Sequence, residues 1–329
     1  DRHENVIALG NSGTGKTHVA LGLGLAACQK GLSVGFTTAA ALEMGMGINA
    51  QLDAPSRFEA KGLGKPSTFS GLPNFAAERV VYGPYTDPVG QAMQNLVNFT
   101  PKHGAHIRDS GLCATCHTVY TDHHGTAFPE QTPYLEWRNS EFQDEDGRTE
   151  TSKTCQECHM PDLGSTRIAR NPQGFDFNIP VRDGYRGHSF VGGNAFMLDI
   201  MSENAEELAV IADPVALERN AAATRKQLAE ATANLKISEI EREDGTVKFS
   251  VKIENLTGHK FPSAYPSRRA WLHVQVRSGR RIVFESGAYD EETGRLIDVV
   301  DALNIPHVQT VTKPEDVVVY ELVAHDEHD

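Results

Sequence analysis

The hydrophobic pattern near the start of this 329-residue chain predicts a strand, a helix and a second strand. Val6–Leu9 and Leu32–Thr37 are short apolar runs that are typical of buried strands. His18–Gln29, between them, has helical character and is followed by Gly31, a residue type that commonly ends helices. We therefore expect one β-α-β unit, the beginning of a parallel sheet.

The pattern weakens in the middle of the chain. Gly, Pro and Ser are frequent from Gly45 to Ala76 and no periodicity persists, which predicts a junction. From Glu78 to Gly193 the chain is rich in histidine, Pro and Gly, and it shows little helical or strand periodicity. A loop-rich region of this kind cannot build a large aliphatic core, so we expect a cofactor to fill its interior.

Regular patterns return in the last third. Asp213-Pro214 predicts a helix start, with Asp as the N-cap and Pro at the first helical position. Apolar spacings of three and four from Leu217 to Leu235 predict one helical face. Alternation from Val247 to Ile253 predicts a strand, and Ser278-Gly279 predicts a hairpin turn. With a further strand at Val317–Val323, these patterns predict a small antiparallel β unit, arranged as a sandwich.

Two cysteine-histidine motifs lie in the loop-rich region: Cys113–His117 reads CATCH and Cys155–His159 reads CQECH. In a CxxCH motif both thiols add to the vinyl groups of haem, and the adjacent histidine becomes the proximal iron ligand. The sequence therefore predicts two haems c, with His117 and His159 on the iron. The thioether-forming residues are expected to be Cys113, Cys116, Cys155 and Cys158.

Two alternatives to covalent haem exist for these cysteines. A four-cysteine zinc site shares the CxxC spacing, but it does not need a histidine after each pair. A disulfide framework is less favoured still. The fifth cysteine, Cys28, lies in an apolar helical stretch and is expected to be a core residue.

An electron-transferring haem needs a second axial ligand, and neutral imidazole is the usual one. His188 follows Gly187 and precedes Gly192–Gly193, and these glycines remove side chains that would obstruct a flat macrocycle. His106 lies shortly before the first motif, and His259 lies in a turn after a strand. We expect His188 and His106 to be the distal ligands, with His259 next.

The chain from Glu78 to the C-terminus resembles the multihaem c-type cytochromes. The resemblance implies an electron carrier of the periplasm or cell surface, with other redox proteins or haem subunits as partners. A reductase with one open iron site is an alternative. The stretches that carry the resemblance are Asp109–Leu112, Cys155–Pro161, His188–Asn194, Thr257–Pro262 and Pro266–Leu272.

A nucleotide-binding motif stands between the first predicted strand and helix. The sequence GNSGTGKT at Gly10–Thr17 fits the pattern GxxxxGK[ST], in which backbone N–H groups face phosphate, the lysine reaches the β- and γ-phosphates, and Ser or Thr binds Mg²⁺. The sequence therefore predicts a site for ATP and Mg²⁺. Its residues are Gly10, Gly13, Gly15, Lys16 and Thr17.

Residues 4–42 resemble the transposition helper ATPases of the IstB type, through Leu9–His18, Leu25–Cys28 and Phe36–Ala40. This resemblance implies an alternative function, an ATP-binding helper of DNA transposition in the cytoplasm. An ATPase also needs a later strand that ends in acidic residues, and none follows Leu42 before the haem region. We therefore interpret the segment as a truncated fragment fused to a different protein, and we do not expect ATP hydrolysis.

Charge and hydropathy narrow the remaining possibilities. The formal net charge of -13 opposes a nucleic-acid partner, because phosphates repel an acidic chain. No run of apolar residues is long enough to predict a membrane span. The predicted fold is of mixed class: a truncated β-α-β P-loop fragment (1–44), a junction (45–77), a loop-rich, haem-packed α region (78–200), packing helices (201–240) and an antiparallel β domain (241–329).

Overall fold

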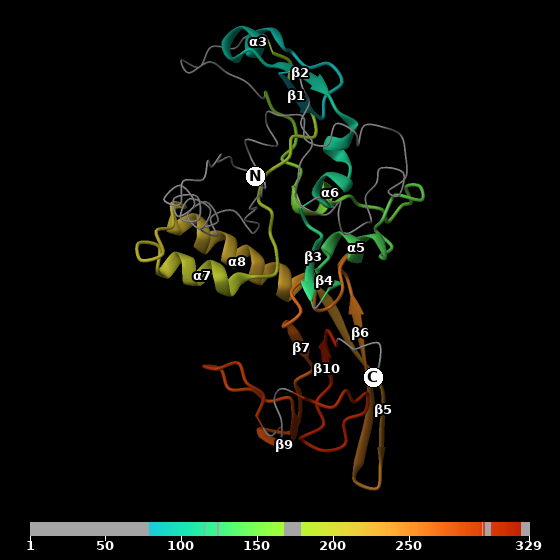
Figure 1. The fold of residues 1–329 in the computed structure, drawn as a ribbon. Helices are drawn as coiled ribbons and strands as arrows, with labels where there is room; N and C mark the ends of the chain where they lie inside the picture. Colours follow the sequence, from blue (N-terminus) through green and yellow to red (C-terminus); the bar gives the residue numbers. More distant parts are fainter. Residues whose placement is uncertain are drawn as a thin grey trace. The chain divides into compact units, whose positions relative to one another are not determined.

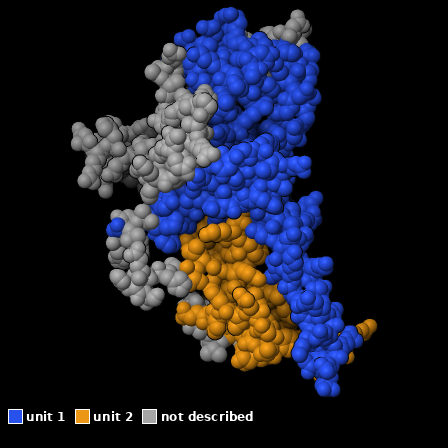
Figure 2. Space-filling model, turned by 90° about the vertical axis from the view of Figure 1, so that its right-hand side faces the viewer, with its two compact units in different colours: residues 1–258 blue, residues 259–329 orange. Residues whose placement is uncertain are grey.

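The structure is a computed structural model that describes residues 79–114, 116–123, 125–167, 179–297, 299 and 304–323. The predicted P-loop fragment and junction lie outside these residues. The chain divides into one unit of residues 1–258 and another of residues 259–329, and each is described by itself (Figure 2). Among the described residues, no helix has the length and apolar character needed to cross a membrane.

The described part of the first unit begins with a small β-α-β arrangement (Figure 1). Strands β1 (Val80–Gly83) and β2 (Thr100–His103) pair in parallel, and helix α3 (Gln91–Val97) connects them. The 3-10 helix η3 (Ala105–Arg108) and the short helix α4 (Gly111–Ala114) follow. These elements lead the chain into the first cysteine motif.

A hairpin and two further short helices complete the region of the cysteine motifs. Strands β3 (Val119–His123) and β4 (Thr126–Gln131) pair antiparallel, and helix α5 (Pro133–Arg138) follows them. Helix α6 (Cys155–His159) consists of the second motif itself. The buried cluster in this region is small and contains Ala114, Tyr134 and Trp137.

Helices α7 (Ala195–Glu203) and α8 (Pro214–Glu230) pack against each other. The Asp213 side chain accepts a hydrogen bond from Val215 N at 3.0 Å, which confirms the predicted N-cap before Pro214. Their shared core is formed by Leu198, Met201, Leu217 and Ala221.

The helix ends earlier than the apolar spacing suggests. Leu235, expected on the face of α8, lies instead in strand β5 (Ala233–Glu243), where it pairs with Ile253 of β6 (Thr246–Asn255). The partial burial of alternate residues in β6 confirms the strand predicted at Val247–Ile253. Cross-strand pairing with this apolar face stabilises the strand conformation of Leu235 over a longer helix.

The described part of the second unit contains two antiparallel strand pairs. Strand β7 (Arg269–Trp271) pairs with β10 (Val319–Glu321), and β8 (Val274–Ser278) pairs with β9 (Arg281–Ser286). Gly279 has a positive φ in the β8–β9 turn, as the hairpin prediction requires. In the described part of this unit the strands pair two by two, so the larger sheets of the expected sandwich are not formed there. Strands as short as β7 and β10 supply few ladder hydrogen bonds for a third strand to extend.

Candidate functional site

The first cysteine motif forms a single helical turn. Cys116 N and His117 N both donate hydrogen bonds to Cys113 O, at 3.1 and 2.8 Å. Residues three positions apart on such a turn share a face, so both cysteines lie on the same side of the turn. Cys113 and Cys116 are partly buried, and His117 is exposed. Both thiols and the imidazole can therefore be reached by one flat ligand.

Aromatic residues of α5 support the first motif. Ala114 is completely buried and packs with Tyr134 and Trp137. Tyr134 N donates to His117 O at 3.3 Å, and Trp137 Nε1 donates to Lys153 O at 2.7 Å. Burial, together with a short hydrogen bond to Glu145, raises the pKa of Tyr134 far above its usual range. Tyr134 is thus a neutral residue that ties the motif to the loop after α5.

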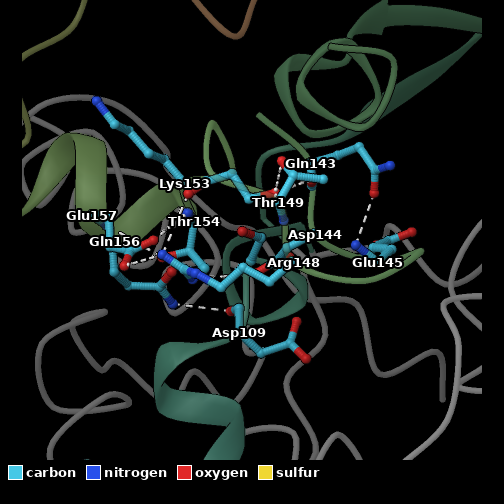
Figure 3. A network of polar contacts seen from close by, with 12 residues as sticks. Asp109, Gln143, Asp144, Glu145, Arg148, Thr149, Lys153, Thr154, Gln156 and Glu157 are labelled. Atoms are coloured by element: carbon cyan, nitrogen blue, oxygen red, sulfur yellow. Dashed lines mark hydrogen bonds and ion pairs between the residues drawn. The ribbon is translucent and has the colours of Figure 1, made fainter. Parts of the chain in front are cut away.

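The second motif is held by a capping box at the N-terminus of α6. Glu157 N donates to Thr154 Oγ1 at 3.3 Å, and Thr154 N donates to the Glu157 carboxylate at 2.8 Å. Arg148 also binds this carboxylate at 2.6 Å (Figure 3). Partial burial raises the pKa of Glu157, but the bonds from Arg148 and Thr154 outweigh it and hold this pKa below its usual range. The cap at Thr154 therefore fixes the start of the helix at Cys155.

A second carboxylate beside Arg148 has the opposite shift. Burial raises the pKa of Asp144, and the negative charge of Asp109 raises it further. Arg148 lies 3.7 Å from Asp144 and only partly opposes these effects. Figure 3 shows these groups in a polar network that also contains Gln143 and Thr149.

The described cysteines are thiols rather than disulfides. Cys158 is an exposed residue, but its thiol is partly buried, and this burial raises the pKa of the thiol. It is therefore protonated at neutral pH and is not activated as a nucleophilic thiolate. In the part of the chain that the structure describes, no group of three or more His, Cys, Asp or Glu residues could hold a metal ion. A haem does not require such a group, because the macrocycle itself surrounds the iron.

The chain returns to the second motif through a short antiparallel ladder. Bridges join Asp162 to Arg186 and Thr166 to Arg182, so the residues after α6 run beside those that precede His188. Phe190 N then donates to His159 O at 3.1 Å. This return brings the His188 segment into direct contact with the second motif.

The His159 imidazole lies 3.0 Å from the backbone oxygen of Val191, measured from Nδ1. A carbonyl oxygen can only accept, so Nδ1 must carry the proton in this contact. In the neutral ring the lone pair is then on Nε2. Metal-binding histidines are commonly oriented in this way, by a backbone carbonyl on the other ring nitrogen. The surroundings of His159 thus fit an iron ligand.

The two motifs are also joined to each other. Cys155 N donates to Ser110 Oγ at 3.0 Å. Gln156 Nε2 donates to Ile107 O at 3.1 Å and to Asp109 O at 2.9 Å. Ser110 and Gln156 are both buried. The second motif is therefore fixed on the segment that leads into the first.

The three candidate distal histidines have different surroundings. His188 is exposed, and its ring lies edge-on to Phe190 with 5.7 Å between centroids. His106 is completely buried in η3 and lies 5.1 Å from the Tyr82 ring. His259 is partly buried and begins the second unit. The residues of the predicted nucleotide site lie outside the described residues: Gly10, Gly13, Gly15, Lys16 and Thr17.

Sequence reasoning missed several residues that shape the site. Thr154 and Glu157 form a T-x-x-E pattern, which is a recognisable capping-box signal. Ser110 and Gln156 gave no such signal, because their partners are 45 to 49 residues away. Val191 contributes its backbone, so the identity of its side chain reveals nothing about the contact.

Comparison with known proteins supports the N-terminal prediction. A family model described as IstB-like ATP binding protein matches residues 1–53, which include the predicted P-loop. The N-terminal segment is thus IstB-like, as expected from its sequence. No curated protein and no solved structure matches the chain. The resemblance to multihaem cytochromes stays a prediction that rests on the residues of this chain.

We expect Thr154→Ala to weaken α6, because alanine cannot accept the hydrogen bond from Glu157 N. Loss of an N-cap costs roughly 1 kcal/mol, or a factor of about five in the opening of the helix. Hydrogen exchange at the amides of Glu157 and Cys158 should accelerate by that factor. Thr154→Ser keeps the hydroxyl and is the control. Equal exchange in the two variants would contradict the capping role.

Proposed function

We propose that this chain is an electron-transfer protein with two covalent haems c, attached at Cys113–His117 and Cys155–His159. The observation that carries the proposal is the arrangement at the second motif. Two thiols one helical turn apart adjoin an imidazole whose Nδ1 donates to Val191 O, which places the lone pair of the neutral ring on Nε2, the atom that would bind iron. When bound, haem iron takes up and releases single electrons.

The residues of the chain attach, orient and shield the cofactors in this proposal. Cys113, Cys116, Cys155 and Cys158 form the thioethers, and His117 and His159 are the proximal ligands. Exposed apolar side chains in the segments flanking the second motif provide surface that a macrocycle can cover. These side chains are Leu163, Val181, Tyr185, Phe196 and Met197.

The contacts of His159 bear on which haem His188 serves. Nδ1 of His159 contacts the backbone oxygen of Val191, three residues after His188. In an imidazole ring the Nε2 lone pair is directed roughly opposite to the Nδ1–H bond. A distal ligand on the same iron would have to approach from the direction in which Nε2 points. His188 is therefore the proposed distal ligand of the haem at the first motif. His106 and His259 are the further candidates, and an iron that lacks a distal ligand would instead be an open reductase site.

The compartment and partners follow from the cofactor. Covalent attachment of haem to CxxCH motifs takes place outside the bacterial cytoplasm in the cytochrome family, so we propose the periplasm or cell surface. The proposed partners are other redox proteins or haem subunits. The acidic net charge of -13 opposes a nucleic-acid partner.

A second function, nucleotide binding by the N-terminal segment, is favoured by the family match at residues 1–53. That match supports ATP and Mg²⁺ binding at Gly10–Thr17 and the alternative of a helper protein of DNA transposition in the cytoplasm. No comparison supports the haem assignment, which rests on the two motifs and their geometry. We propose binding without hydrolysis, because the sequence between Leu42 and the haem region predicts no strand that ends in acidic residues for Mg²⁺ and water.

The haem proposal is tested by acid–acetone extraction followed by mass spectrometry. Two haem masses should stay on the chain, because thioether bonds survive this treatment. Cys155→Ala combined with Cys158→Ala should leave one haem, whereas Cys28→Ala, outside any CxxCH motif, should leave two. A wild-type chain that loses its colour on extraction would refute covalent attachment.

We expect His188→Ala to convert one haem from low spin to high spin, because the iron loses its imidazole. Low-temperature electron paramagnetic resonance measures this change. The same change to high spin should occur when His188→Ala is combined with Cys155→Ala and Cys158→Ala, which remove the second motif, because His188 is assigned to the haem at the first motif. The matched control is His103→Ala, which removes another exposed histidine. A low-spin spectrum in His188→Ala identical to that of the wild type would mean that His188 binds neither iron.

We expect Lys16→Ala to abolish binding of a fluorescent ATP analogue, since Lys16 is the predicted contact of the β- and γ-phosphates. Haem content and reduction potential should not change. ATP hydrolysis by the wild-type chain that is lost in Lys16→Ala would show that the N-terminal segment is a working ATPase rather than a fragment.

A further inference from the structure

The two cysteine motifs meet through buried hydrogen bonds around Ser110. Its backbone oxygen accepts from Cys113 N at 3.0 Å and Ala114 N at 3.1 Å, so Ser110 begins the turn of the first motif. Its hydroxyl accepts from Cys155 N at 3.0 Å, at the start of α6. One residue, 2% exposed, thus binds the first cysteine of both motifs.

Gln156 makes the second half of this connection. It is the first of the two residues between the cysteines of the second motif. Haem attachment does not use the side chain at this position. Its amide nitrogen donates to Ile107 O and Asp109 O, at 3.1 and 2.9 Å. The Asp109 carboxylate accepts from Gly111 N at 2.7 Å and so fixes the start of α4, which leads into the first motif.

We infer that Ser110 and Gln156 are positioning residues that fix the separation and orientation of the two haems. The inference rests on the proposed function. The helices at the motifs are short: α4 ends within the first motif, at Ala114, and α6 has the five residues of the second motif. Each attached haem would therefore follow the orientation of its turn. Electronic coupling between two redox groups falls steeply with their separation. A rigid connection between the turns therefore keeps this coupling constant.

The hydrogen bonds of Ser110 and Gln156 determine how strongly the two motif turns are held together. Each neutral hydrogen bond stabilises the joined state by a factor of about five in equilibrium, so loss of the two bonds from Gln156 should weaken it by roughly 25-fold. Ser110 and Gln156 make these contacts in a region whose buried apolar cluster is small. Few other contacts are available there to replace the lost bonds.

The experiment compares Gln156→Ala, Gln156→Met and Ser110→Ala with the wild type, each as the full chain with haem attached. Circular dichroism in the Soret band reports the separation and mutual orientation of the two haems, because their exciton coupling gives a paired positive and negative signal. We expect two haems to be retained and the paired signal to be reduced in all three variants. Hydrogen exchange at Cys155 N should accelerate in the Gln156 variants. Gln156→Met keeps the side-chain volume, so it separates hydrogen bonding from packing.

Gln143→Ala is the matched control. This glutamine lies in the same polar network, but its side chain accepts from Glu145 N and Asp146 N within one loop. It should leave the paired Soret signal unchanged. A wild-type signal that persists at full strength in all three test variants would overturn the positioning role and leave the proposed function standing. A wild-type chain with no covalent haem would refute both.

Discussion

The described region around the two motifs depends on hydrogen bonds at the ends of very short helices. A helix of four or five residues cannot satisfy most of its own terminal N–H groups, so other groups must do so. Thr154, Ser110 and Asp109 supply these acceptors. Ser110 and Asp109 also join the first motif to α6, by accepting from Cys155 N and Gln156 Nε2. Helix capping is therefore what holds the motif region together where aliphatic burial is small.

The two units obtain their order in different ways. In the first unit, α7 and α8 form an ordinary apolar helix contact, while the motif region relies on polar connections and an apolar cluster of three buried residues. In the second unit, strand pairs are joined around a small cluster of Ile305, Val317 and Val319. A large cofactor would suit the motif region best, since it would add apolar contact where the polypeptide provides little.

Local patterns in the sequence predicted the local structure well. The start of α8 at Asp213-Pro214 and the strand at Val247–Ile253 follow from residues a few positions apart. The predicted hairpin turn forms one residue later than expected, at Gly279-Arg280, because Ser278 pairs with Arg281. Leu235 was misassigned because its periodicity suits a helix, whereas its strand partner lies in β6. The connections of Ser110, Gln156 and Val191 could not be predicted, since they join residues that the fold alone brings together.

The contact between His159 and Val191 has an electronic consequence. A carbonyl that accepts from Nδ1 increases the electron density at Nε2, and a more basic ligand stabilises oxidised iron over reduced iron. His159 is partly buried and held in this way, whereas His117 is exposed to water. Under the proposed function, the two motifs would thus offer iron unequal surroundings. Inequality of this kind gives two neighbouring redox centres different potentials, and with them a preferred direction of flow.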